Sequence, residues 1–248
     1  MSDCRKNIVI DIGNSYTKIA AYQNNILTDF NLFEVINLET IKSFCKHYGE
    51  EFSCIVSYVK DYPKSVAKYL NDRYHVVNFD SETPLPIKIQ YSSPETLGLD
   101  RRAIAVGAAH RFPGNNLLNI DSGTALKYDF ITSEGVYVGG AISPGIMMRY
   151  KSLHYFTDKL PFVEYIGNTE LIGNSTYKSI TSGVLNGILH EVEGTIKSYQ
   201  QMYNDVKIIL SGGDYRFFDN NLNFKTFTAP NIILEGLNII LNYNLEIN

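Results

Sequence analysis

The sequence predicts an α/β protein made of two lobes of duplicated topology with a cleft between them. An apolar run, a D-x-G turn and a return strand occur at Asp11 and again at Asp121. Around these two copies, helix-like stretches alternate with short apolar runs, as they do in βα units. The 248 residues are enough for two such lobes. A duplicated domain of this kind is expected to direct both turns toward one ligand.

The first lobe is predicted to span residues 1–112. It opens with N-I-V-I-D-I-G, a run typical of a buried strand, and the chain turns at Gly13. The alternating T-K-I-A-A-Y that follows predicts a return strand, with a second turn at Asn24 and Asn25. The same patterns predict helices over 38–48, 63–73 and 99–111, strands over 52–58 and 75–79, and a proline-rich loop over 81–94.

The second lobe is predicted to span residues 113–248, because F-P-G at 112–114 interrupts the chain. It begins with N-L-L-N-I-D-S-G-T-A-L-K-Y-D-F, which repeats the run, the turn and the return strand of the first lobe. A third strand is expected over 135–141 and a long helix over 176–203. V-K-I-I-L-S-G-G then predicts a strand that ends in a glycine turn.

Composition excludes several classes of partner and site. The 22 Lys and Arg residues against 26 Asp and Glu residues give a net charge of -4, so we expect neither nucleic acid nor a membrane surface as partner. The N-terminus resembles neither a signal peptide nor a membrane anchor. Cys4, Cys45 and Cys54 form no C-x-x-C pair, which favours a reducing cytoplasm. No P-loop, G-x-G-x-x-G or G-x-S-x-G motif occurs.

Both D-x-G turns carry groups that suit a polyphosphate. Glycine lets backbone amides approach phosphate oxygens, hydroxyls add donors, and carboxylates can hold Mg²⁺. Asp and Gly are also ordinary turn residues, so a single copy is more simply a turn and the repetition carries the argument. The paired glycines of G-G-A-I-S-P-G-I and S-G-G-D either admit a nucleotide or form tight turns.

Two further features have alternative interpretations. Asp100 precedes Arg101 at the start of a predicted helix, where it serves either as a general base or as a carboxylate stabilised by the helix dipole. Gly183 and Gly187 share one face of the long helix. Each costs roughly 1 kcal/mol relative to Ala, which close packing against another helix would offset.

Five motifs, taken in order, resemble those of the type III pantothenate kinases, members of the actin, hexokinase and Hsp70-like ATPase superfamily. They are D-I-G-N-S with Lys18, Y-x₆-G-L-D-R, D-S-G-T-A, G-G-A-I-S-P-G and S-G-G. The resemblance spans nearly the whole chain and implies two actin-like (ribonuclease H-like) lobes. It also implies a cytoplasmic homodimer that phosphorylates pantothenate with ATP to 4′-phosphopantothenate, the first step of coenzyme A biosynthesis.

The resemblance also implies roles for individual residues. Asp100 would accept the proton of the substrate hydroxyl, and Asp121 would bind a monovalent cation, K⁺ or NH₄⁺, while Mg²⁺ accompanies ATP. The residues expected to bind ATP are Asp11, Ile12, Gly13, Asn14, Ser15, Tyr16, Thr17, Lys18, Thr124, Gly212 and Gly213. Those expected to bind pantothenate are Tyr91, Gly98, Leu99, Asp100, Arg101 and Thr176.

The chain departs from the family pattern after D-S-G-T-A. Leu126 and Lys127 stand where the family commonly has threonines, and Lys127 is expected either to contact a phosphate or to point to solvent. Two alternative functions stay open at this point. One is a kinase for another small hydroxyl compound, and the other is a non-catalytic, ATP-binding regulatory homologue.

Overall fold

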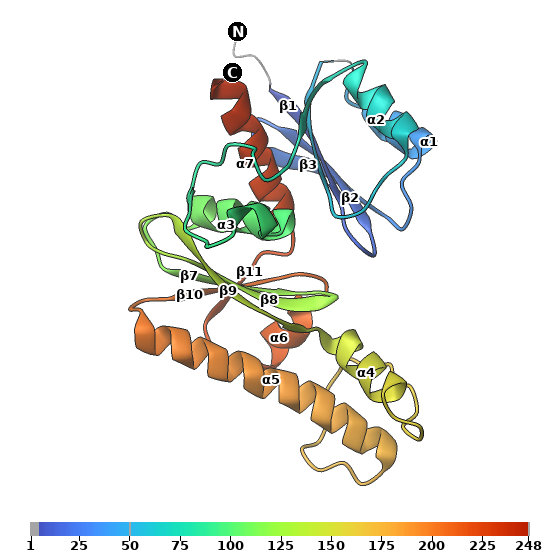
Figure 1. Ribbon diagram of the computed structural model, residues 1–248, viewed down its shortest axis with the longest axis vertical. Helices are drawn as coiled ribbons and strands as arrows, with labels where there is room; N and C mark the ends of the chain where they lie inside the picture. The colour runs from blue at the N-terminus through green and yellow to red at the C-terminus, as the bar shows by residue number, and fades with distance from the viewer. Residues whose placement is uncertain (1–4, 50, 248) are drawn as a thin grey trace. The chain divides into compact units, whose positions relative to one another are not determined.

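Each half of the protein is built on its own β-sheet (Figure 1). The computed structural model describes residues 5–49 and 51–247, so Cys4 lies outside the described residues. They divide into two units. The first unit contains the described residues up to Arg111 together with the last helix, and the second unit is Phe112–Asn231.

The sheet of the first unit has the strand order β3-β2-β1-β4-β5. Its first three strands form an antiparallel meander, and the other two continue the sheet parallel to β1. Its strands are β1 (Lys6–Ile12), β2 (Thr17–Gln23), β3 (Ile26–Phe33), β4 (Ser53–Tyr58) and β5 (His75–Asn78). The apolar runs of β1 and β4 are buried because these strands lie inside the sheet.

The helices of the first unit lie where the local signals predict, with one addition. They are α1 (Leu38–Lys46), α2 (Lys64–Asn71), α3 (Leu99–Arg111) and α7 (Ile232–Ile247). The side chain of Asn37 caps α1 by accepting a hydrogen bond from the Thr40 amide at 2.9 Å. A short strand, β6 (Lys88–Ile89), and a 3₁₀ turn, η1 (Pro94–Thr96), interrupt the loop before α3.

The sequence predicts that the second lobe spans 113–248, whereas helix α7 belongs to the first unit. Its backbone crosses that of α3 so closely that a Cβ on Gly236 would lie 1.8 Å from the carbonyl oxygen of Ala103. A Cβ on Gly107 would lie 2.5 Å from the Ile232 oxygen. Only glycine permits such an approach, and burial of the largely apolar α7 stabilises it.

The strands of the second unit repeat the order of the first. They run β9-β8-β7-β10-β11, again as an antiparallel meander extended by parallel strands. Their bounds are β7 (Leu117–Ser122), β8 (Ala125–Ile131), β9 (Val136–Pro144), β10 (Lys207–Ser211) and β11 (Thr226–Thr228). Asp11 and Asp121 are therefore the next-to-last residues of equivalent strands in separate sheets. The predicted α/β fold with duplicated topology is confirmed.

The helices of the second unit are α4 (Ile146–Tyr155), α5 (Thr176–Met202) and α6 (Tyr215–Asn221). The long α5 follows one face of the sheet (Figure 1) and buries Leu185, Ile188 and Val192 in the core. Close packing of Gly183 and Gly187 is not found within the described residues, because a Cβ on either would meet no atom within 4 Å. Among the described residues, no helix combines the length and apolarity needed to cross a bilayer.

Candidate functional site

In the first unit, three polar residues become neighbours where β1 ends. Asp11 is the next-to-last residue of β1 and pairs in register with Lys18 of antiparallel β2 and with Ser57 of parallel β4. Asp11 and Ser57 are only 6% and 1% exposed. The sheet therefore places a carboxylate, a lysine and a hydroxyl side by side, and the sequence motif contained only the first two.

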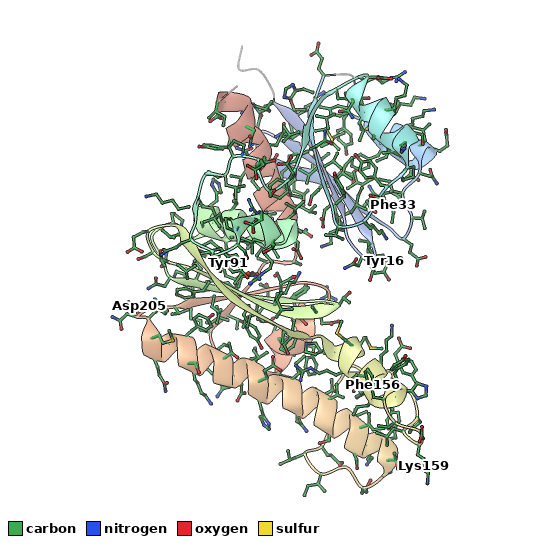
Figure 2. The ribbon with its side chains drawn as sticks, viewed as in Figure 1. Tyr16, Phe33, Tyr91, Phe156, Lys159 and Asp205 are labelled. Atoms are coloured by element: carbon green, nitrogen blue, oxygen red, sulfur yellow. The ribbon has the colours of Figure 1, made fainter. Side chains whose placement is uncertain are left out.

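The turn after β1 presents short polar side chains. Gly13 donates its amide to the carbonyl of Tyr16 at 3.0 Å, which closes the turn. The Lys60 ammonium donates to the carbonyl of Asn14 at 2.9 Å. Asn14, Ser15 and Tyr16 are exposed, and Tyr16 lies at the tip of this turn (Figure 2).

Two of the residues expected to bind ATP have side chains directed into the protein. Ile12 and Thr17 flank the turn, and each is only 1% exposed. They help to shape the strand end, and their side chains are closed to a ligand on the surface.

The segment Gly98–Arg101 forms the start of α3. The Arg101 amide donates to Asp100 Oδ1 at 2.9 Å, so the carboxylate caps the beginning of the helix. A Cβ on Gly98 would lie 2.6 Å from this same oxygen, so glycine leaves room for the carboxylate. The positive end of the helix dipole favours the ionised carboxylate, which is the form that accepts a proton. Arg101 itself is 5% exposed.

Arg102, the residue after the G-L-D-R motif, ties the preceding loop to α3. Its guanidinium donates to the carbonyl of Ser81 at 2.9 Å and to that of Pro94. Burial lowers the pKa of Arg102 from its ordinary value, although the carboxylates of Glu82 and Asp80 oppose this shift. The anchored loop carries Tyr91, which is labelled in Figure 2 and is partly exposed.

In the second unit, the end of β7 carries an equivalent set of three residues. Asp121 pairs in register with Lys127 of antiparallel β8 and with Ser211 of parallel β10. Lys127 Nζ lies 2.7 Å from Asp121 Oδ2. The Ser211 hydroxyl donates to Asp121 Oδ1 at 3.1 Å and accepts from buried Asn119 Nδ2 at 3.2 Å. Both oxygens of the Asp121 carboxylate therefore have a partner within the protein.

This arrangement does not fit an additional cation on Asp121. Two unit positive charges about 4 Å apart repel by about 4 kcal/mol at an effective dielectric constant of about 20, which offsets much of the attraction between the carboxylate and a second cation. The side chains of Asp121 and Lys127 are only 15% and 16% exposed, so solvent screens little of this repulsion. Lys127, expected either to contact a phosphate or to point to solvent, forms an ion pair with the residue expected to bind K⁺ or NH₄⁺ and is largely shielded from solvent.

Three glycine-containing motifs meet at the same strand end. Gly212 has φ +86°, and a Cβ there would lie 2.1 Å from the carbonyl oxygen of Ser122. A Cβ on Gly145 would lie 2.2 Å from the carbonyl oxygen of Gly123. Gly145 also donates its amide to Thr124 at 3.3 Å. D-S-G-T-A, G-G-A-I-S-P-G and S-G-G thus form one backbone cluster, and Gly213 is exposed within it.

Arg149 holds the end of β9 and was not expected from the sequence. Its Nε donates to the carbonyl of Pro144, and its Nη2 donates to Ser143 Oγ, both at 2.8 Å. The guanidinium also pairs with Glu191 of α5, which accepts from Tyr128 at 3.1 Å. The ion pair positions the loop that carries Gly145.

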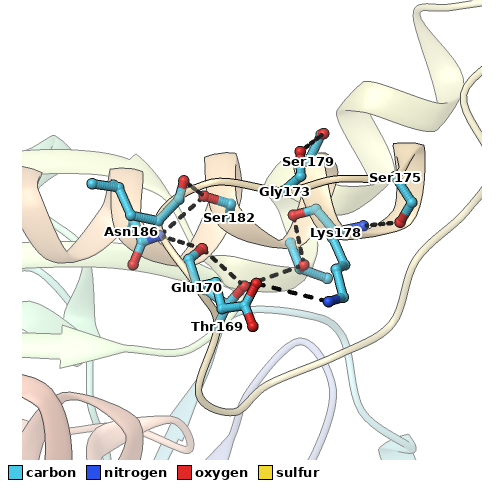
Figure 3. Close-up of polar contacts among 10 residues, drawn as sticks. Thr169, Glu170, Gly173, Ser175, Lys178, Ser179, Ser182 and Asn186 are labelled. Carbon is cyan, nitrogen blue, oxygen red and sulfur yellow. Dashed lines mark hydrogen bonds and ion pairs between the residues drawn. The ribbon is translucent and has the colours of Figure 1, made fainter.

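Thr176 is exposed and is the first residue of α5. It is not part of the three motifs that form the backbone cluster. The loop before it is held along the helix (Figure 3). Ser182 Oγ donates to the carbonyl of Leu171 at 2.6 Å, and Asn186 donates to that of Glu170 at 3.3 Å. Ser175 caps the helix by accepting from the Lys178 amide at 3.3 Å.

A divalent metal carried by a nucleotide fits the carboxylates that are present. The described residues contain no group of three or more His, Cys, Asp or Glu side chains that would form a metal cage. Mg²⁺ commonly binds through one or two carboxylates together with the phosphates of its substrate. Asp11, which lies near a strand end beside exposed turn residues, is the carboxylate that would hold such a metal.

Comparisons with known proteins agree with this architecture. A family model described as type III pantothenate kinase matches residues 7–198. A type III pantothenate kinase of Christiangramia forsetii is 42% identical over 239 residues, which are 96% of this chain and 98% of that protein.

Two solved structures show the fold. One, described as a Baf family transcriptional activator from Campylobacter jejuni, has a TM-score of 0.60 at 18% identity and covers 96% of this chain and 99% of its own. A glucokinase from an Antarctic psychrotroph has a TM-score of 0.51 at 11% identity with the same coverage of 96% and 99%. The family match and the relative at 42% identity go further than the fold: the chain belongs to the type III pantothenate kinase family.

Proposed function

We propose that this protein transfers the γ-phosphoryl group of ATP to the primary hydroxyl of pantothenate, giving 4′-phosphopantothenate and ADP, the first step of coenzyme A biosynthesis. The observation that carries the proposal is the family match over most of the chain. The position of Asp100 at the start of α3 supports it, because its carboxylate accepts the Arg101 amide and lies at the positive end of the helix dipole.

In this mechanism Asp100 accepts the hydroxyl proton while the substrate oxygen bonds to the γ-phosphorus. The bond from that phosphorus to the bridging oxygen breaks, and ADP leaves. Mg²⁺, when bound with ATP beside Asp11, neutralises charge on the phosphates. Backbone amides at the glycine turns stabilise negative charge that develops during transfer.

Two segments are proposed to bind ATP. Asp11 to Lys18 contribute from the turn after β1, and Thr124, Gly212 and Gly213 contribute from the backbone cluster at the end of β7. The exposure of Asn14, Ser15 and Gly213 supports this assignment. The family resemblance implies K⁺ or NH₄⁺ beside Asp121, whose carboxylate already pairs with the Lys127 ammonium.

Pantothenate is proposed to contact the Gly98–Arg101 segment, Tyr91 and Thr176. The anchoring of the Tyr91 loop by Arg102 supports the first two, because it fixes that loop relative to α3. We further propose a cytoplasmic homodimer on the family resemblance. The open face at Gly183 and Gly187 would suit a second copy of the chain.

Coupled measurement of ADP release tests the function. Pantothenate is expected to stimulate ADP release in proportion to 4′-phosphopantothenate identified by mass spectrometry. A panel of sugars should give no more than the background ATP hydrolysis. Stimulation by a sugar and not by pantothenate would mean that the sugar is the phosphoryl acceptor. ATP binding without any phosphoryl transfer would indicate the non-catalytic regulatory homologue.

A further inference from the structure

The ion pair at the end of β7 results from the strand register of the second unit. Antiparallel pairing places Lys127 directly opposite Asp121, so the two side chains leave adjacent strands side by side. Their contact at 2.7 Å is largely shielded from water. Strand pairing alone places the positive charge of this lysine beside the carboxylate, and no loop has to fold over the site to bring it there.

The first unit has the same register, which supports the interpretation that strand pairing brings the lysine and the aspartate together. Lys18 stands opposite Asp11 in the same way that Lys127 stands opposite Asp121. The turn between β7 and β8 is shorter than the turn between β1 and β2, and the aspartate is still paired with a lysine. Ser57 and Ser211 occupy the same place on the parallel neighbour.

Hydrogen bonds also fix the carboxylate from its other side. Ser211 donates to Asp121 Oδ1 at 3.1 Å and is itself held by Asn119, which is 0% exposed. The carboxylate is therefore oriented by a buried amide and neutralised by a tethered ammonium. A cation that is free in solution would have to approach this ammonium closely to reach the same oxygens.

We propose that the Lys127 ammonium replaces the monovalent cation at Asp121, so that ATP binding and turnover in this protein are independent of K⁺ and NH₄⁺. The inference rests on the proposed function for its turnover readout. Its binding readout needs ATP alone, so it can succeed or fail whether or not pantothenate is the acceptor.

The test compares ATP binding in two chloride salts of matched ionic strength, about 0.1 M, because salt screens every charge. One contains K⁺ and the other tetramethylammonium, which is too large for a site made for K⁺. Calorimetric titration with Mg²⁺ and a non-hydrolysable ATP analogue gives the Kd, and coupled ADP release gives turnover. The wild-type protein should show the same Kd and kcat in both salts within roughly twofold.

The variant Lys127→Thr should convert the protein to cation dependence. In tetramethylammonium its Kd for the ATP analogue should rise roughly tenfold or more, and K⁺ should restore most of the loss. Lys127→Arg, which keeps the charge, should remain independent of K⁺. Lys207→Thr is the matched control, because Lys207 begins β10 at the opposite end from Ser211 and should leave both values near wild type.

Two outcomes would overturn the proposal. The first is a wild-type Kd that weakens roughly tenfold without K⁺, which would mean that a cation binds in addition to Lys127. This comparison needs no variant, so it decides the matter even where Lys127→Thr fails to fold. The second is a folded Lys127→Thr protein whose Kd in tetramethylammonium equals that of the wild type.

Discussion

The two strand ends at Asp11 and Asp121 have the same strand register and differ in the loops that surround them. In both units the aspartate faces a lysine on the antiparallel neighbour and a serine on the parallel one. After Ser57 the first unit continues with Tyr58, which is 40% exposed. After Ser211 the second unit continues with Gly212, whose backbone packs against the Ser122 carbonyl.

This difference separates what topology determines from what the loops determine. The repeated strand order makes the same three residue types neighbours twice. The loops then leave the first end with exposed polar side chains, whereas the second end becomes a backbone cluster that requires glycine. In the proposed function, the acid–base chemistry belongs to the first unit, and the second provides amides and a neutralised carboxylate.

The largest effect is expected from Asp100→Asn, which tests the assignment of proton acceptance to the first unit. An amide has a similar shape and cannot accept the proton, so kcat should fall by about 10²–10⁴-fold. The Kd for ATP should change little. Steady-state kinetics and calorimetry measure both quantities.

Glu95→Gln is the matched control, because Glu95 is an exposed carboxylate in the same region of the chain. It should keep the wild-type kcat. An Asp100→Asn enzyme that retains most of its kcat would show that Asp100 only stabilises the start of α3.

The next effect concerns the backbone cluster of the second unit. Gly212→Ala introduces a Cβ at a left-handed φ of +86° and 2.1 Å from a carbonyl oxygen. Strain and overpacking together should lower the free energy of unfolding by about 2–5 kcal/mol. Denaturant titration followed by circular dichroism measures this loss.

Gly213→Ala provides the control one residue later, where a Cβ would meet no described atom within 4 Å. Its unfolding free energy should stay close to that of the wild type. Equal stability of the two variants would contradict the packing of Gly212 against Ser122.

The smallest effect is expected at Asp214, whose amide donates to the Ser122 carbonyl at 3.0 Å. Burial raises the pKa of the Asp214 carboxyl above its ordinary value. A raised folded-state pKa favours folding only while the group is protonated, and this contribution is lost as pH rises through the folded-state pKa. The ionised form therefore lowers stability at neutral pH.

Asp214→Asn should remove this cost and raise the free energy of unfolding at pH 7 by about 0.5 kcal/mol or less, since solvent screens a partly exposed group. The difference from wild type should disappear below the ordinary carboxyl pKa of about 3.9, where both side chains are neutral. Urea titrations across this pH range measure it. A gain that is unchanged in acid would mean that the carboxyl charge is not its cause.

Local patterns alone determined much of this protein. The apolar runs and D-x-G turns predicted β1, β2, β7 and β8, and helical periodicity predicted α1, α2, α3 and α5. Motif order identified the family and placed Asp100 at the start of a helix. These features depend on residues a few positions apart, because side-chain period and turn chemistry are local properties.

Only the tertiary structure decided the contacts between distant segments. The assignment of α7 to the first unit depends on Gly107 and Gly236, which are far apart in the chain and meet where two helix backbones cross. Ser211 lies 90 residues beyond Asp121 and reaches it through the parallel pairing of β10 with β7. The sequence shows Lys127 as a departure from a motif. In the structure Lys127 is the partner of Asp121, because the register of strand pairing determines which side chains face each other.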